Sequence, residues 1–328
     1  MHIAFADGLR ELRADNGNGS FSGRSELGPG RVRSDSERFR LPRKLVIETG
    51  GSPYYDEGER DKWEGMEMGL SVGFIGTGGI AGNHLNNLKS IAGAAVTAFC
   101  DIQLERAERA AQQWPDAKAY TKVDEMLDDR RLDAVYICVP PMAHGEAELA
   151  VIERGLPFLV EKPLGIDREL PERIARRLRE KPVLSSVGYH WRYSEAAKTA
   201  RELLANRTPG MALGYWMGGM PGVPWWRVQS GSGGQFVEQT THIVDLLRYL
   251  LGEVEEVYAA YGSRVMHEKV EGTDVPDVGT ATMKLRGGIV ATISNTCLLP
   301  VGHHVGLDIY TDSGIMEVRG GSIKDIAK

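Results

Sequence analysis

A glycine turn between an apolar run and a helical segment constrains the fold of this 328-residue chain more than any other feature. The run Val72–Ile75 predicts a buried strand of a parallel sheet, and Ile80–Leu88 follows helical spacing. Gly76 can adopt the backbone angle of a tight turn, and Gly78 lets the backbone approach a diphosphate at a helix N-terminus. Ala81 takes the third small position, where the helix packs on the strand. Since such a turn alone is weak evidence, its context decides the interpretation.

The context is a second apolar strand, Ala95–Cys100, which ends in Asp101. The acid lies at about the 20-residue distance expected for the group that binds the ribose hydroxyls of a dinucleotide. A 2′-phosphate would meet a negative charge there, so Asp101 favours NAD over NADP. Strand, glycine turn, helix, strand and acid occur in this order, and together they predict a cofactor site.

Composition and charge exclude several classes of protein. The net charge of −6 argues against a nucleic-acid partner, because no basic excess is available to neutralise phosphates. No apolar run approaches the ~20 residues of a membrane span, and the N-terminus lacks the apolar core of a signal peptide. Cys100, Cys138 and Cys297 lack metal-ligand spacing and indicate a reducing compartment. We therefore expect a cytoplasmic protein with neither a membrane nor a metal as partner.

The first 67 residues differ from the rest of the chain. They contain clusters of Gly, Pro, Asn and Ser with interspersed arginines, and Leu45–Ile47 is their one plausible strand. Such a segment buries too little apolar surface to offset its ordering entropy. It is either a disordered tail or a non-native extension upstream of a natural start at Met66 or Met68, and we favour the second interpretation.

Residues 68–188 alternate between strand and helix patterns. This alternation predicts an α/β Rossmann domain with a parallel, doubly wound sheet covered on both faces. Asp101, Pro140 and Lys162 each follow a predicted strand, so they should meet at the carboxyl edge of the sheet, where ligands of such folds bind.

Residues 189–328 follow a different pattern. Predicted helices over Ser194–Asn206 and Gln235–Leu251 accompany several strands, and short turns at Arg286–Gly288 and Thr311–Gly314 predict two hairpins. This predicts an α+β domain with a mostly antiparallel open sheet. Because few helices are available to cover it, we expect one face to meet a partner subunit.

Five stretches of the chain resemble the Gfo/Idh/MocA oxidoreductases from about Met68 onward. They are Gly76–Ala81, Asp133–Pro141 with His144, Glu161-Lys162-Pro163, Gly188–Tyr193 and Gly233–Asp245. The resemblance implies a Rossmann domain, a C-terminal sheet used for homodimers or homotetramers, and a nicotinamide cofactor. Members of the family mostly oxidise or reduce a hydroxyl–ketone pair on a sugar, polyol or related small molecule.

The chain departs from the pattern of this family in two places. Glu238 stands where members usually carry Asp, four residues before a histidine. Members also continue for several dozen residues beyond the equivalent of Lys328, so the α+β domain is expected to be shortened at its C-terminus.

The predicted catalytic residues are Lys162, His242 and Glu238. Lys162 matches the lysine that exchanges a proton with the substrate in the family, although a solvated loop lysine would give the same pattern. On one continuous helix Glu238, His242 and Asp245 would share a face, and Glu238 would orient the His242 ring. The alternatives are a helix that shows these groups to water and, more remotely, a metal site.

Several further residues are predicted to bind ligands. Tryptophan faces stack on sugars and arginine pairs with anionic or hydroxyl groups, although a packing cluster under the loop would explain the same residues. The predicted substrate-binding residues are Tyr189, Arg192, Trp225, Trp226, Arg227 and Asp245. The predicted cofactor-binding residues are Gly76, Gly78, Gly79, Ile80, Asp101, Pro140, His144, Glu161 and Lys162.

These observations favour an NAD-dependent dehydrogenase or reductase that acts on the CH–OH group of a small polar substrate such as a sugar or polyol. Two alternatives stay open. A redox-neutral glycosidase of the same family would use NAD only transiently, and a non-catalytic regulator would bind NAD or sugar without turnover.

Overall fold

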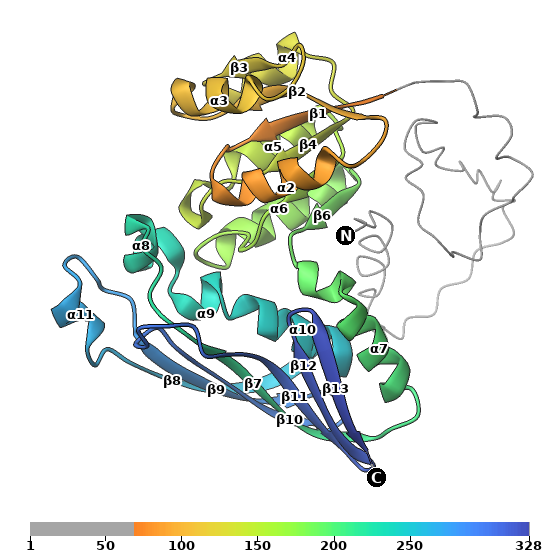
Figure 1. The fold of residues 1–328 in the computed structure, drawn as a ribbon, viewed down its shortest axis with the longest axis vertical. Helices are drawn as coiled ribbons and strands as arrows, with labels where there is room; N and C mark the ends of the chain where they lie inside the picture. The colour runs from red at the N-terminus through yellow and green to blue at the C-terminus, as the bar shows by residue number, and fades with distance from the viewer. Residues whose placement is uncertain (1–68, 328) are drawn as a thin grey trace, which may run out of the picture.

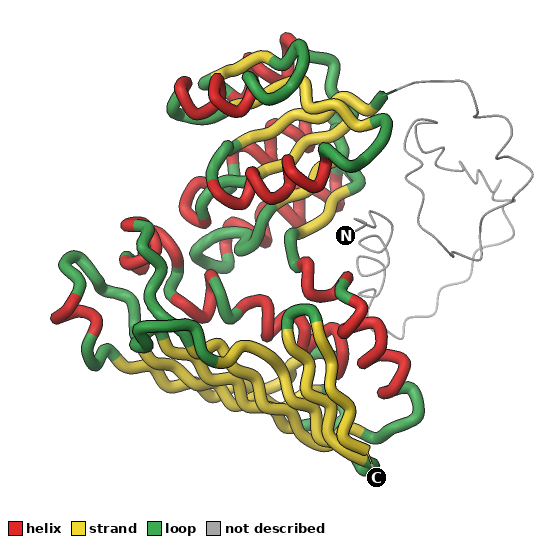
Figure 2. Tube along the Cα trace, in the orientation of Figure 1, coloured by secondary structure: helices red, strands yellow, loops and turns green. Residues whose placement is uncertain are grey.

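The computed structural model describes residues 69–327, which form two sheets with helices around and between them (Figures 1 and 2). The predictions for residues 1–67, including the strand at Leu45–Ile47, lie outside the described residues. In the described part of the chain, no helix is both long enough and apolar enough to cross a membrane.

The first sheet is entirely parallel and has the order β3-β2-β1-β4-β5-β6. Its strands are β1 Leu70–Ile75, β2 Ala94–Cys100, β3 Lys118–Tyr120, β4 Ala134–Ile137, β5 Phe158–Val160 and β6 Ser185–Val187. The strand order reverses direction at β1, which pairs with β2 on one side and β4 on the other. A crevice at the carboxyl ends of the strands forms at such a switch point.

Helices cover both faces of this sheet, as predicted. One buried cluster joins the sheet to α2 (Gly79–Leu88) and α3 (Leu104–Ala111). The other includes residues of α4 (Val123–Asp129), α5 (Glu146–Glu153) and α6 (Glu169–Glu180). The predicted α/β Rossmann architecture is therefore confirmed.

The second sheet has seven strands in the order β13-β12-β11-β7-β10-β9-β8, and within it only β7 and β10 run parallel. Both predicted hairpins are present, as β9–β10 and β11–β12. The strands are β7 Pro209–Met217, β8 Val254–Gly262, β9 Val278–Leu285, β10 Val290–Thr296, β11 His304–Thr311, β12 Gly314–Arg319 and β13 Ser322–Ala327. The mostly antiparallel open sheet is confirmed.

Helices α7 (Glu195–Leu204) and α10 (Thr241–Leu251) cover one face of the seven-stranded sheet. Apolar side chains of α10, among them Ile243 and Leu246, are fully buried against the sheet. In Figure 1, α9 (Gln235–Glu238) and α10 lie between the two sheets. The residues at the start of α10 are thereby brought toward the carboxyl edge of the parallel sheet.

The predicted continuous helix Gln235–Leu251 is wrong, because the structure divides it into α9 and α10. Gln239 and Thr240 separate the two helices. The Thr240 hydroxyl accepts a hydrogen bond from Asn295 Nδ2 at 2.9 Å, and Thr240 is fully buried. This contact comes from β10, so it fixes a break that helical periodicity alone does not reveal.

A short connection without a regular helix follows β4. A 3₁₀ turn over Pro141–Ala143 comes first, and helix α5 begins after it at Glu146. Gly145 caps α5 with φ 122°, an angle that glycine tolerates best. His144 therefore lies in the connection between the two elements.

Gly76 should be the least replaceable glycine of the turn. Its φ is +85°, and a Cβ added there would lie 2.4 Å from the Cys138 carbonyl oxygen, whereas a Cβ on Gly78 would meet no atom within 4 Å. Gly76→Ala should reduce the free energy of unfolding by at least about 2 kcal/mol. Gly78→Ala, the matched control, should leave it nearly unchanged. Equal denaturation midpoints for the two variants would contradict this prediction.

Candidate active site

The N-terminus of α2 has the features of an anion site. Gly78 is the N-cap residue, no side chain caps the helix, and its first turn contains no acidic residue. Cβ atoms built on Gly78 and Gly79 meet open space, so the backbone is accessible there. Free amides at a helix N-terminus attract phosphate groups. These residues fit the diphosphate of a dinucleotide.

Asp101 lies beside this turn, directly after β2. One carboxylate oxygen accepts hydrogen bonds from the Thr77 N–H at 3.0 Å and the Thr77 hydroxyl at 2.9 Å. The other accepts the Gln103 N–H at 3.0 Å. These contacts fix a partly exposed carboxylate next to the glycine turn, and its binding of the ribose hydroxyls stays a prediction.

Lys162 and Glu238 form an ion pair between the two sheets. Lys162 follows β5, and its Nζ donates to Glu238 Oε1 at 2.6 Å and to the Glu238 carbonyl at 2.8 Å. The second carboxylate oxygen of Glu238 accepts the Trp226 Nε1–H at 2.7 Å. The lysine side chain is only 15% exposed, which rules out the alternative of a solvated loop lysine.

The predicted contact between Glu238 and His242 is not present in the structure. Because the helix breaks at Thr240, Glu238 belongs to α9 and binds Lys162 and Trp226, while His242 lies in the first turn of α10. Asp245, the third member of the expected helical face, binds Arg192 instead. Glu238, His242 and Asp245 therefore do not form one hydrogen-bonded group.

His242 is buried among aromatic rings. Its ring centroid lies 4.8 Å from that of His190 and about 6 Å from those of Tyr189, Trp191 and Trp216. Burial is the largest cause of a pKa of about 3 for His242. The positive charge of Lys162 and the electrostatic effect of His190 also lower this pKa. Its Nδ1 is enclosed without a hydrogen-bond partner among the described residues. The ring is therefore neutral at physiological pH.

Arg192 and Asp245 bind each other through two hydrogen bonds, of 2.7 Å and 2.5 Å. Arg192 lies in the 3₁₀ turn His190–Tyr193, and Asp245 is nearly fully buried on α10. The Tyr189 hydroxyl lies 3.0 Å from that of Thr241, also on α10. The three residues connect the end of the parallel sheet to α10, and their contact with substrate stays a prediction.

The tryptophan pair divides between two environments. Trp226 is 1% exposed and packs with Val275 and Cys297, whereas Trp225 lies partly buried at the edge of this cluster. The packing cluster that the sequence left as an alternative is thus present, and the rings of Trp226 cannot stack on a sugar. The Arg227 carbonyl anchors the 274–275 backbone by accepting two N–H groups. Substrate binding by Trp225 and Arg227 stays a prediction.

His144 lies at the carboxyl edge of the parallel sheet, near Pro140. Its Nδ1 contacts the Glu148 carboxylate, which also accepts the Gly145 N–H at 2.6 Å. Its Nε2 is enclosed and has no partner among the described residues. An oriented but unpaired ring nitrogen suits a contact with a bound cofactor.

His84 is not among the site residues predicted from the sequence. This residue lies on the buried face of α2, and its Nε2 is 2.7 Å from the Glu161 carboxylate. The helical spacing of Ala81, Leu85 and Leu88, which are all buried, places His84 on the same inward face. A histidine within an apolar helix face is the signal that could have identified it.

Two family profiles match this chain in succession. Residues 70–189 match an oxidoreductase family with an NAD-binding Rossmann fold, and residues 199–317 match the GFO/IDH/MocA C-terminal domain. The chain belongs to the Gfo/Idh/MocA oxidoreductase family. The parallel sheet with the glycine turn before α2 agrees with the NAD-binding Rossmann fold of this family.

Relatives of known name include inositol dehydrogenases. Myo-inositol 2-dehydrogenase of Thermotoga maritima is 27% identical over 250 residues, which cover 75% of this chain and 74% of that protein. The NAD⁺-dependent scyllo-inositol 2-dehydrogenase of Bacillus subtilis is 26% identical over a match that covers 76% of this chain and 73% of that protein.

Solved structures share the fold. The WlbA dehydrogenase of Bordetella pertussis, in complex with NADH and UDP-GlcNAcA, superposes with a TM-score of 0.72 at 23% identity, over 78% of this chain and 76% of that one. Levoglucosan dehydrogenase in complex with NADH and levoglucosan superposes with a TM-score of 0.72 at 21% identity. The match covers 79% of this chain and 76% of that one. At this identity the likeness concerns the fold.

The low pKa of His242 should make the protein sensitive to acid. In the unfolded chain histidine binds a proton below about pH 6.5, whereas in the folded protein it does so only near pH 3. The unfolded state therefore binds more protons between these values, and stability should fall as the pH decreases from 7 to 4. His242→Gln should reduce this loss, as measured by thermal unfolding at each pH. Parallel pH profiles for both proteins would contradict the prediction.

Proposed function

We propose that this protein is an NAD-dependent dehydrogenase acting on a CH–OH group of a sugar or polyol. The observation that carries the proposal is the position of Lys162, which Glu238 holds next to a neutral His242 at the carboxyl edge of the parallel sheet. The inositol dehydrogenases among the relatives support a polyol as the substrate class.

Lys162 is the group that transfers the proton. In reduction, its ammonium donates a proton to the carbonyl oxygen of the substrate, and in oxidation the neutral amine accepts the hydroxyl proton. Glu238 stabilises the ammonium form through the 2.6 Å contact. When bound, the nicotinamide supplies or accepts the hydride.

His242 orients the substrate. Because its ring is neutral, one nitrogen can accept the hydrogen bond of a hydroxyl and direct the oxygen toward Lys162. Its low pKa makes it a poor holder of the proton. The proton therefore resides on Lys162, and His242 contributes alignment.

Cofactor residues follow from the same geometry. Gly78, Gly79 and Ile80 would hold the diphosphate at the start of α2, and Asp101 would bind the ribose hydroxyls. Pro140, His144, Glu161 and Lys162 lie at the ends of neighbouring strands. They would surround the nicotinamide.

The chain passes between the two sheets at Gly188–Tyr189, and we place the domain boundary there. All three cysteines are buried and free, which supports a cytoplasmic location.

Lys162→Ala should lower kcat by about 10³-fold, within the range for loss of a general acid–base. The measurement is nicotinamide absorbance after the protein is mixed with NAD and a panel of inositols and sugars. Lys122→Ala, which changes an exposed lysine, is the control. Saturable NAD binding without an absorbance change for any compound would contradict the dehydrogenase. Glycoside cleavage would then indicate the redox-neutral glycosidase, and its absence the regulator.

The uncovered face of the seven-stranded sheet supports a homodimer or homotetramer. Tyr258 of β8, Val290 of β10 and Met211 of β7 point to this face and are 76%, 46% and 41% exposed. Exposed apolar side chains of this size on one face of a sheet favour a protein partner, and a second copy of the chain offers the same surface.

Light scattering of the native protein should give two or four times the 36.0 kDa of one chain. Tyr258→Glu should lower the measured mass toward that of one chain. Its thermal unfolding midpoint should stay close to that of Tyr258→Ser, the uncharged control. A monomeric mass for the native protein at micromolar concentration would contradict the proposed oligomer.

A further inference from the structure

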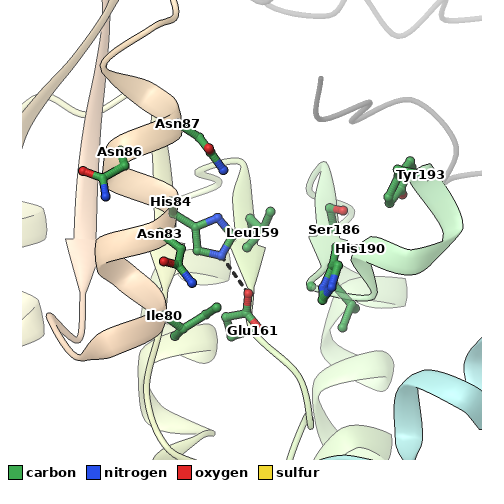
Figure 3. Close-up of a pocket in the computed structure, with 12 residues that line it drawn as sticks. Ile80, Asn83, His84, Asn86, Asn87, Leu159, Glu161, Ser186, His190 and Tyr193 are labelled. Carbon is green, nitrogen blue, oxygen red and sulfur yellow. Dashed lines mark hydrogen bonds and ion pairs between the residues drawn. The ribbon is translucent and has the colours of Figure 1, made fainter. Parts of the chain in front are cut away.

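A buried pair joins the cofactor-binding helix to the strand that precedes Lys162. His84 Nε2, on α2, lies 2.7 Å from Glu161 Oε1, and the two side chains are 10% and 6% exposed. Figure 3 shows the contact crossing from α2 to the end of β5, at the floor of a cavity that Ser186 and His190 border on the opposite side.

Glu161 contacts β4, the backbone of the neighbouring Lys162 and the chain at Gly188. Its backbone N–H donates to the Ile137 carbonyl of β4 at 2.8 Å. Its second carboxylate oxygen accepts the backbone N–H of Lys162 at 3.1 Å. A Cβ added to Gly188 would lie 2.7 Å from the carboxylate, so the carboxylate packs directly on the backbone where the chain leaves the parallel sheet.

The carboxylate therefore fixes the backbone of the proposed proton-transfer residue. A buried carboxylate needs a hydrogen-bond donor or a positive charge to offset its loss of hydration. His84 is the side chain that can donate a hydrogen bond to the Glu161 carboxylate. Without it, the carboxylate would turn toward the water of the cavity and release the Lys162 N–H.

We propose that His84 is a positioning residue that couples the cofactor-binding helix to Lys162 through Glu161. The same helix carries the anion site at its N-terminus, five residues before His84 (Gly79). The pair links the position of α2 to the Lys162 backbone, because one oxygen of the Glu161 carboxylate contacts His84 and the other accepts the Lys162 N–H. This role rests on the proposed function in one respect, since it assumes that Lys162 transfers the proton.

The test compares His84→Leu with His84→Gln. Leucine removes the donor, whereas the glutamine amide can still donate to Glu161. His84→Leu should lower kcat by about 10- to 100-fold, the effect of losing a buried hydrogen bond to a charged group. Its Kd for NADH, measured by fluorescence, should change less than kcat does, because the diphosphate site itself is intact. His84→Gln should recover most of kcat.

A second readout does not depend on turnover. Lys162 should react faster with an amine-specific reagent in cofactor-free His84→Leu than in the native protein, as quantified on the Lys162 peptide by mass spectrometry. His84→Gln should react at the native rate. Asn87→Leu, which changes another residue of α2 lining the same cavity, is the matched control and should also react at the native rate.

The outcomes separate the two proposals. Loss of kcat and faster labelling in His84→Leu alone support the positioning role. Native labelling and native kcat in His84→Leu overturn it, as does equal damage in all three variants. If the native protein turns over no compound, the proposed function fails, and the labelling rates still decide the role of His84.

Discussion

The ion pair between Lys162 and Glu238 is the contact on which the arrangement of the site depends. It joins the end of β5 to α9, so one interaction connects the carboxyl edge of the parallel sheet to the helices that cover the second sheet. Removal of one partner from a buried pair leaves an uncompensated charge and costs about 3 to 5 kcal/mol. Trp226 adds a hydrogen bond to Glu238, and therefore both carboxylate oxygens are occupied.

Much of the fold could be predicted from the sequence because its signals are local. The glycine turn and the hairpin turns depend on residues that are neighbours in the chain. The break between α9 and α10 could not be predicted, since apolar residues continue with helical spacing across it. It depends on Asn295, which lies 55 residues from Thr240 and reaches it only in the folded sheet.

The sequence singled out most side chains of the candidate site, although not His84, and it did not show how they pair. Lys162, Glu238 and His242 were identified, yet Glu238 binds the lysine rather than the histidine. Residue type predicts which groups can react, whereas the partner of each group depends on contacts between distant segments. Trp226 shows the same limit, because an indole that could stack on a sugar is enclosed in a packing cluster and contributes through its N–H.

The two contacts of the Glu238 carboxylate limit which residues can occupy positions 226 and 238 in this family. One oxygen reaches Lys162 and the other reaches Trp226, two partners on different segments of the chain. An aspartate, one methylene shorter, would reach less far from the same backbone position and could not satisfy both. Positions 226 and 238 should therefore change together among relatives, with tryptophan accompanying glutamate and a residue without an indole N–H accompanying aspartate.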